Sequence, residues 1–224
     1  MQLRQLPLPI EWAFSYKPSD FVVSDCNKYA FNWLEKWPFK IHENFVCLVG
    51  ESGSGKTHLA KIWASRLHAE FINCADEMFN KWLDLSSHDS EQKYFVLDDA
   101  DAVLDEVLLF YIYNAIKEKD AYLLLTAKTP PSKWNLSLQD VKSRIATVNI
   151  LNIHRPDEAA VNSIIKKMLE QRGILAKENV VSYIANTIER SYESINYWIN
   201  KIDQNIDKGQ KASLQIIKAV LTHT

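Results

Sequence analysis

The sequence predicts an α/β fold, a parallel sheet flanked by helices, followed by a small all-α domain. Two observations predict this class. Short apolar runs alternate with helical periods up to about residue 153, and strands separated by helical segments are typical of parallel sheets. After Pro156 the alternation stops and only helical periods remain. We therefore expect an extended arm over residues 1–24, an α/β domain over 25–153 and a helical domain over 154–224.

The first predicted elements surround a glycine-rich segment. Residues 1–24 show no period and contain three prolines, so we expect no regular structure there. Ser24 or Asp25 is the expected N-cap of a helix with an aromatic-rich apolar face. The continuous apolar run Phe45–Val49 predicts a buried strand, and Lys56–Leu67 predicts the helix that follows it.

The remaining elements of the α/β part follow from the same patterns. A helix is expected at Val103–Lys119. Four further strands are expected at Glu70–Cys74, Tyr94–Leu97, Tyr122–Thr126 and Ala146–Ile150.

Composition and charge narrow the class of protein. The chain is 47% apolar and 24% charged with a net charge of -2, which is typical of globular proteins and gives no general attraction to DNA or anionic lipid. The three cysteines have no metal-like spacing, and their odd number argues against a disulfide framework. No apolar run is long enough to span a membrane, and Pro7 and Pro9 interrupt the place of a signal peptide. We expect a cytoplasmic protein without a membrane partner.

A glycine-rich segment fits the phosphate-binding pattern G-x-x-x-x-G-K-[ST] without a mismatch. Its glycines let backbone N–H groups surround a phosphate, the lysine reaches the β- and γ-phosphates, and the threonine hydroxyl binds Mg²⁺. A chance match is the alternative, and the position between an apolar strand and a helix argues against it. The predicted ligands of ATP or ADP are Gly50, Glu51, Ser52, Gly53, Ser54, Gly55, Lys56 and Thr57.

Two aspartates, Asp98 and Asp99, directly follow the apolar run Tyr94–Leu97. Two acids after a strand usually belong to a turn or a helix cap. At the end of a strand beside a phosphate-binding loop, however, a carboxylate can orient Mg²⁺ and its waters. We therefore predict Asp98 as a Mg²⁺ ligand together with Thr57, and Asp99 as a residue that polarises an attacking water.

With both motifs in place, the chain resembles the AAA+ ATPases, and within them the bacterial replication-initiator clade of DnaA, over most of its length. Asp20-Phe21-Val22-Val23 looks like the segment ahead of the phosphate loop in that clade. Gly55-Lys56-Thr57-His58-Leu59 matches its GKTHL sequence. The resemblance implies an AAA+ fold with a helical lid, entered at Arg155-Pro156-Asp157, and it adds His58 to the expected nucleotide-binding residues.

Two further segments of the resemblance concern hydrolysis. Tyr122–Pro131 looks like the sensor 1 strand, which implies that Thr126 bonds a phosphate or a water. Ser143-Arg144 resembles the pair that carries the arginine finger, which implies that Arg144 reaches the γ-phosphate of a partner's ATP. The alternative for Arg144 is a solvated or salt-bridged helix-end arginine.

Two positions depart from the clade. Lys128 stands where an acid follows sensor 1, and Glu193 stands where a lid arginine of the clade contacts the nucleotide. A carboxylate facing phosphates would repel them, although an acid in the first turn of a helix is also an ordinary helix start. Arg190 is a candidate substitute. Weak or absent intrinsic ATP hydrolysis is expected on this ground.

The first residues resemble a protein-binding motif. Gln5-Leu6-Pro7-Leu8-Pro9-Ile10 is similar to the sliding-clamp-binding motif of the Hda family, DnaA homologues that inactivate DnaA. Leu6, Leu8 and Ile10 can anchor an extended arm in an apolar groove, and Gln5 can add one hydrogen bond. The alternative is that the hexapeptide packs on its own domain.

The resemblance implies a regulator that promotes hydrolysis of DnaA-bound ATP together with the replicative sliding clamp. A DnaA-like initiator and the clamp are the expected partners. Assembly into a homo-oligomer is a further possibility. Because no helix-turn-helix segment is recognised, no sequence-specific DNA binding is expected. A DnaC-like helicase loader is the first alternative, disfavoured by the acidic balance of the α/β part. A small P-loop phosphotransferase is the second, disfavoured because the lid has no clustered arginines.

Overall fold

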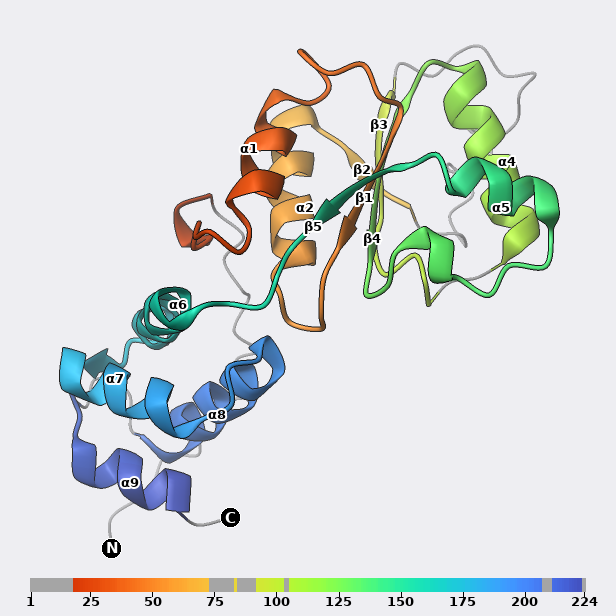
Figure 1. Cartoon of the computed structure of the whole chain (residues 1–224). Helices are drawn as coiled ribbons and strands as arrows, with labels where there is room; N and C mark the ends of the chain where they lie inside the picture. The colour runs from red at the N-terminus through yellow and green to blue at the C-terminus, as the bar shows by residue number, and fades with distance from the viewer. Residues whose placement is uncertain (1–17, 73–82, 84–91, 103–104, 207–210, 223–224) are drawn as a thin grey trace, which may run out of the picture.

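The computed structural model describes residues 18–72, 83, 92–102, 105–206 and 211–222. Within them a five-stranded parallel sheet forms the centre of the α/β part (Figure 1). Its strands are β1 (Phe45–Val49), β2 (Glu70–Phe71), β3 (Tyr94–Leu97), β4 (Tyr122–Ala127) and β5 (Asn149–Asn152). They lie in the order β2-β3-β4-β1-β5, and every pair is parallel. The predicted fold class is confirmed.

The order of the strands brings three loops together. β1 lies between β4 and β5, and β3 is the other neighbour of β4. In register, Val49 pairs with Ala127 and Leu97 pairs with Leu125. The segments that leave the carboxyl ends of β1, β3 and β4 therefore emerge side by side at one edge of the sheet, the usual place of a ligand in parallel sheets.

Helices cover both faces of the sheet. The helices α1 (Lys28–Lys36) and α2 (Lys56–Leu67) lie on one face, and α4 (Glu106–Glu118) and α5 (Gln139–Ile145) lie on the other (Figure 1). Each face has its own buried apolar cluster, one around Trp37 and Trp63 and the other around Phe95. Short 3-10 helices form at Pro18–Asp20 and Pro131–Lys133.

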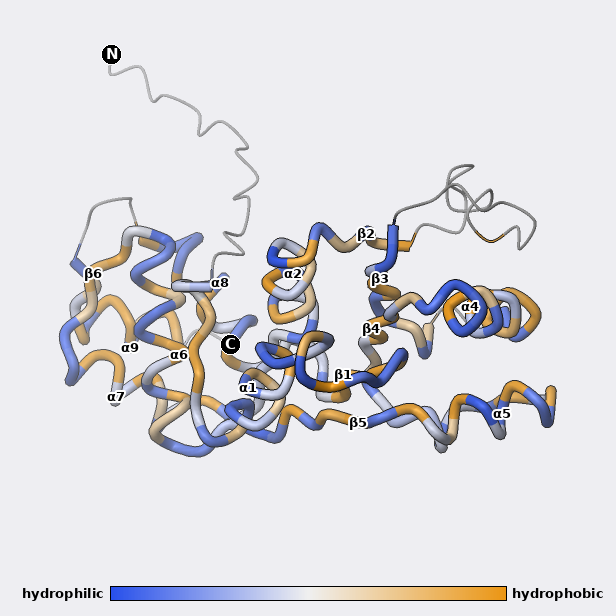
Figure 2. The backbone as a smooth tube through the Cα atoms, turned by 90° about the horizontal axis from the view of Figure 1, so that it is seen from above, coloured by the Kyte–Doolittle hydropathy of each residue, from blue (hydrophilic) through white to orange (hydrophobic). Residues whose placement is uncertain are grey.

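The rest of the chain is a helical part beside the sheet (Figure 2). It contains α6 (Glu158–Gln171), α7 (Glu178–Thr187), α8 (Tyr192–Asn205) and α9 (Leu214–Thr222). Isoleucines and valines on their inner faces make a third core, with Ile165, Ile199 and Ile217 fully buried. The expectation of an all-α part needs one correction, because β6 (Leu175–Ala176) and β7 (Lys211–Ala212) pair as a two-stranded parallel sheet. The proposed division between residues 153 and 154 stays a prediction.

Several boundaries differ from those predicted. The first helix begins at Lys28, because Ser24 O accepts the N–H groups of Asn27 and Lys28 and so closes a turn ahead of it. Neither Ser24 nor Asp25 is its N-cap. The last strand of the sheet begins at Asn149 rather than Ala146, because residues 146–148 continue the hydrogen bonds at the end of α5.

Three other bounds also shift. The strand expected at Glu70–Cys74 is short, Glu70–Phe71, and residues 73 and 74 lie outside the described part. The helix expected at Val103–Lys119 runs from Glu106 to Glu118, where the Asp105 side chain caps it by accepting from the N–H groups of residues 107 and 108.

Candidate functional site

The glycine-rich loop lies between β1 and α2, where Gly50 follows the strand and Gly55 occupies the N-cap position of the helix. Gly53 and Gly55 adopt positive φ angles of 75° and 89°, which glycine reaches at little cost. A Cβ on Gly53 would lie 2.5 Å from Nδ2 of Asn196, and one on Gly55 would lie 3.1 Å from the Phe21 ring. The loop therefore needs these glycines both for its backbone and for its close neighbours.

Polar groups of the loop point inward. Lys56 is 5% exposed, and its ammonium donates to the carbonyl oxygens of Gly50 at 3.0 Å and Glu51 at 2.9 Å. Its burial lowers the pKa of Lys56, an effect that the carboxylates of three nearby aspartates oppose. The Ser54 hydroxyl is buried and has no hydrogen-bond partner among the described residues. A buried cation and an unsatisfied hydroxyl inside a glycine loop fit an anionic group such as a phosphate.

Three predicted residues are joined by hydrogen bonds at the strand ends. The Thr57 hydroxyl donates to the carboxylate of Asp98 at 3.0 and 3.2 Å, and the Thr126 hydroxyl donates to the same carboxylate at 2.5 Å. Thr126 is fully buried and its oxygen also accepts the N–H of Asp99 at 2.9 Å. Thr57 of α2, Asp98 after β3 and Thr126 of β4 thus form one hydrogen-bonded group.

Asp99 stands apart from this group. Its φ of 49° is positive, and its exposed side chain lines the pocket described next.

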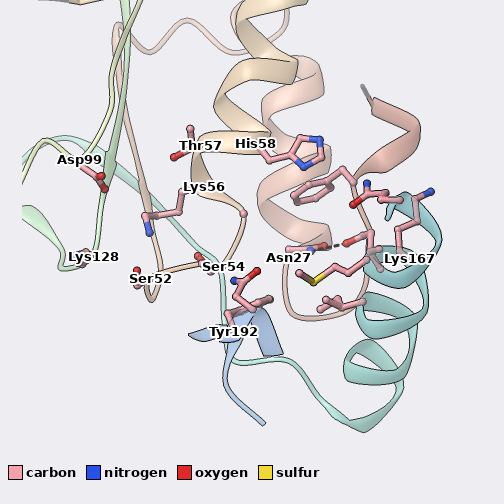
Figure 3. A pocket seen from close by; sticks show the side chains of 18 residues that line it. Asn27, Ser52, Ser54, Lys56, Thr57, His58, Asp99, Lys128, Lys167 and Tyr192 are labelled. Carbon is pink, nitrogen blue, oxygen red and sulfur yellow. Dashed lines mark hydrogen bonds between the residues drawn. The ribbon is translucent and has the colours of Figure 1, made fainter. Parts of the chain in front are cut away.

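A pocket of about 430 Å³ opens above the loop, between the α/β part and the helical part (Figure 3). Its volume is in the range of ligand sites. The lining comes from the arm before α1, from the loop and α2, and from the strand ends and the helices α6 and α8. The residues are Phe21, Val22, Asn27, Ser52, Gly53, Ser54, Gly55, Lys56, Thr57, His58, Asp99, Lys128, Ile164, Lys167, Met168, Gln171, Tyr192 and Asn196.

Most of the predicted ligands therefore meet. Ser52 through His58 line the pocket, whereas Gly50 and Glu51 lie behind it and hold Lys56 by their carbonyl oxygens. Phe21 packs edge-on against the His58 ring at 5.3 Å between centroids. Asn27 fixes the segment beside it by donating to Val22 O at 2.8 Å and accepting from Ser24 N at 2.9 Å.

Sequence reasoning missed the contribution of the helical part. From α6, Ile164, Lys167, Met168 and Gln171 face the pocket, and from α8, Tyr192 and Asn196 do so. The helical periodicity of α6 indicated only an apolar face, and nothing in the pattern distinguished a pocket wall from a core. The Lys167 ammonium bonds to Ser19 O, which ties α6 to the arm before α1.

Glu193 lies in the first turn of α8, one of its two expected settings, and outside the pocket that Lys56 lines. Glu193 does not line the P-loop pocket; it lines a separate cleft of about 640 Å³ together with Glu51, Ser52, Lys128 and Glu189, among others. The α8 side chains that face the pocket are Tyr192 and Asn196, four residues apart on one side of the helix. Arg190, the candidate substitute, is an exposed residue paired with Glu158 at 3.0 Å.

Arg144 lies away from the pocket of its own chain. It is at the end of α5, where its guanidinium pairs with Asp140 at 3.1 Å and donates to Asn114 Oδ1 at 2.5 Å. The same group stacks over the rings of Phe110 and Tyr113 at 5.1 and 5.5 Å. About a third of the side chain stays exposed.

Other predicted features lie elsewhere. Gln5, Leu6, Leu8 and Ile10 fall outside the described residues. Cys26 and Cys47 are buried free thiols, and Cys74 is outside the described residues. Among the described residues no cluster of three His, Cys, Asp or Glu side chains could hold a metal ion. No helix in the described ranges has the length and apolar character needed to cross a bilayer.

Comparisons with known proteins agree with this geometry. The chain is 26% identical to the chromosomal replication initiator DnaA of Campylobacter jejuni over 92% of its own length and 52% of that protein. It thus spans about half the length of the curated relatives it matches. It is also 22% identical to an uncharacterised protein of Haemophilus influenzae, over 97% of this chain and 98% of that one. No family model matches the chain.

Solved structures show the same fold. Domain III of Thermotoga maritima DnaA superposes with a TM-score of 0.72 at 19% identity, covering 92% of this chain and 95% of that one. A DnaA structure bound to AMPPCP and single-stranded DNA gives 0.66 at 18% identity, covering 87% and 66%. The Holliday junction motor RuvB of Thermotoga maritima gives 0.66 at 16% identity, covering 92% and 71%. The fold is that of an AAA+ module, and the sequence relation shows that the chain is homologous to the AAA+ domain of the DnaA replication initiators.

Proposed function

We propose that the chain binds ATP or ADP with Mg²⁺ in the P-loop pocket. The observation that carries this proposal is the hydrogen-bonded group of Thr57, Asp98 and Thr126 beside a loop with a buried lysine and an unpartnered Ser54 hydroxyl. DnaA structures of the same fold bound to AMPPCP support it. The pocket volume leaves room for a base between the arm and α6.

Each predicted residue has a role in this proposal. The Thr57 hydroxyl and the Asp98 carboxylate would hold Mg²⁺, which keeps waters and substrate phosphates as its other ligands. When bound, Mg²⁺ neutralises charge on the β- and γ-phosphates. Lys56 would turn from the loop carbonyls to the phosphates, and Ser54 would find its partner there. Asp99 and Thr126 would orient an attacking water.

Calorimetry with ATP and ADP tests the nucleotide proposal. Lys56→Ala removes the buried cation of the loop and should weaken binding of both nucleotides by roughly 100-fold or more, since a charge-assisted hydrogen bond in a desolvated site is lost. Lys133→Ala removes an exposed lysine that does not line the pocket and serves as the matched control. Equal affinities for Lys56→Ala and the unmodified chain would refute the proposal.

We further propose that the protein regulates the initiation of chromosome replication, as Hda-like proteins do, by promoting hydrolysis of DnaA-bound ATP at the sliding clamp. Homology to the AAA+ domain of DnaA supports a role beside DnaA. Arg144 supports action in trans, because a finger must lie at the surface and outside its own pocket. Residues 5–10 would tether the protein to the clamp and so raise the local concentration of one partner.

The two proposed contacts can be separated. Gln5→Ala combined with Leu8→Ala should abolish clamp binding and leave nucleotide affinity unchanged. Arg144→Ala should retain clamp and nucleotide binding but fail to shorten the lifetime of DnaA-bound ATP, because charge developing on the γ-phosphate loses its stabilising cation. Lys142→Ala, an exposed cation on the same helix, is the control. If the unmodified chain with clamp and DNA leaves that lifetime unchanged, the regulatory role is wrong and a helicase loader becomes the better assignment.

A further inference from the structure

Lys128 is the first residue after β4, and its backbone is held at the mouth of the P-loop pocket. Its N–H donates to Asp101 Oδ2 at 2.9 Å, and the N–H and hydroxyl of Thr129 donate to the same oxygen at 3.0 and 3.2 Å. Asp101 belongs to the segment after β3. One carboxylate thus ties the loops of two neighbouring strands together, and this fixes the backbone from which the lysine side chain extends.

The Lys128 side chain lines two cavities. It contributes to the P-loop pocket and also to the adjacent cleft, and Ser52 is the other residue that lines both. In Figure 3 Lys128, Ser52 and Asp99 lie at one end of the pocket, and Asn27, His58 and Lys167 lie at the other, with Lys56 between the two groups. A nucleotide whose base lies on the Asn27 side would direct its terminal phosphate toward Lys128.

Among the described pocket residues, the helical part places no cation at this end. The α8 side chains in the pocket are Tyr192 and Asn196, which are neutral. Lys167 of α6 lies toward the opposite end, where it bonds to Ser19 O. Lys56 lies deeper and is close enough to Lys128 for the second charge to contribute, after burial, to lowering the Lys56 pKa. Lys128 is therefore a second cation, besides Lys56, at the end of the pocket where a third phosphate would lie.

The adjacent cleft offers the lysine an alternative partner. Glu189 and Glu193, at the end of α7 and the start of α8, line this cleft with Lys128. Glu51, the third acid in it, is already paired with Arg155 at 2.6 Å. An ammonium between the two cavities is attracted by a phosphate on one side and by carboxylates of the helical part on the other.

We propose that Lys128 distinguishes ATP from ADP: its ammonium binds the terminal phosphate of ATP, and in its absence turns toward Glu193 in the adjacent cleft. This inference rests on the proposed nucleotide site and adds to it the residue that reads the third phosphate. It also gives Glu193 a role on the helical part that needs no contact with the nucleotide. Lys128 is a specificity-determining residue here, and Glu193 acts only through it.

The test measures the affinities of the full chain for Mg²⁺-ATP and Mg²⁺-ADP by calorimetry. Lys128→Met keeps the length of the side chain and removes its charge; it should lower ATP affinity about tenfold, as expected for one charge-assisted hydrogen bond, and leave ADP affinity within about twofold. Lys133→Met makes the same change at an exposed lysine outside both cavities and should alter neither affinity.

Glu193→Gln removes the competing carboxylate and should raise the ratio of ATP to ADP affinity about two- to fivefold. In the double variant with Lys128→Met that gain should vanish, since the carboxylate acts through the lysine. A Lys128→Met variant that loses ATP and ADP affinity equally, or loses neither, would overturn the inference while leaving the nucleotide site intact. Failure of the unmodified chain to bind either nucleotide would overturn the nucleotide site as well. A gain from Glu193→Gln that persists without Lys128 would show direct repulsion of the nucleotide and would also overturn it.

Discussion

The two walls of the pocket differ in how closely their residues match expectation. On the sheet side, Lys56 and Thr57 line the pocket, and Asp98, directly after β3, accepts hydrogen bonds from Thr57 and from Thr126 near the end of β4. On the helical side, the acid expected to face the phosphates points into another cleft, and two neutral residues, Tyr192 and Asn196, take its place.

The difference has a geometric cause. In a parallel sheet the register of the strands fixes where each one ends, so a residue just after an apolar run is placed by the run itself. On a helix each residue turns the side chain by about 100°, so an adjacent position faces a different surface. Which side of α8 meets the loop depends on how the helix packs on α6 and α9, and its apolar period fixes only the face that is buried among them. The following experiments test whether the two walls are as different as the structure indicates.

The largest effect is expected where the two walls touch. Gly53→Ala should cost about 1–2 kcal/mol of unfolding free energy for its positive φ, and it should also weaken nucleotide binding roughly tenfold because the new methyl displaces Asn196 and the loop. Gly173→Ala is a matched control, since its φ is 74° with nothing within 4 Å of the added Cβ. The Gly173→Ala variant should lose stability but keep its nucleotide affinity. Denaturant unfolding and calorimetry on both variants check this; equal nucleotide affinities would contradict the contact between loop and α8.

A second experiment tests the hydrogen-bonded group of Thr57, Asp98 and Thr126 on the sheet side. Thr126→Val keeps the shape of a fully buried side chain but removes the hydroxyl that bonds Asp98 and the Asp99 N–H. We expect a loss of about 1–2 kcal/mol in unfolding free energy, because buried polar groups then lack a partner. Thr129→Val, at an exposed position, should change stability by less than about 0.5 kcal/mol. Similar losses of unfolding free energy in the two variants would mean that the Thr126 hydroxyl does not stabilise the contact between the ends of β3 and β4.

A third experiment tests the rotation of α8. Asn196→Asp is nearly isosteric and should weaken ATP binding about tenfold, close to 1.4 kcal/mol, since it brings a like charge to the phosphates. Because Glu193 lines the adjacent cleft, Glu193→Gln should change ATP affinity less than Asn196→Asp does, and should raise it. Titration of both variants with ATP distinguishes the two faces of the helix. A larger effect at Glu193 than at Asn196 would place the former against the nucleotide after all.

The smallest effect concerns a surface contact that orients the helix carrying Arg144. The Glu106 carboxylate accepts the N–H groups of Leu138 and Ser137 ahead of α5, and these bonds hold the pKa of Glu106 below its ordinary value. The contribution to stability is therefore present above the ordinary pKa and is lost as pH falls through the lowered one. The Glu106→Gln variant should melt below the unmodified chain at neutral pH. The difference between the two melting temperatures should shrink as the pH is lowered to about 3, which a series of thermal melts measures. A constant gap would exclude this linkage.

Much of the α/β part follows from local patterns. The bounds of β1, α2 and β3 are those predicted, because a continuous apolar run or a strong helical period leaves little choice. The start of β5 was misjudged because the hydrogen bonds that end α5 reach into residues 146–148. The start of α1 was misjudged because Asn27 bonds backward to the arm and not to the first turn of the helix.

The sequence by itself determined the glycine loop, the carboxylate after β3 and the hydroxyl in β4, because each is placed by the strand beside it. Its resemblance to known families also implied the AAA+ class. Tertiary structure alone decided which residues of α6 and α8 close the pocket, that Glu193 faces a different cleft, and that Lys128 stands between the two cavities. Those outcomes depend on the rotation and packing of whole helices against a sheet, which are set by side chains far apart in the chain.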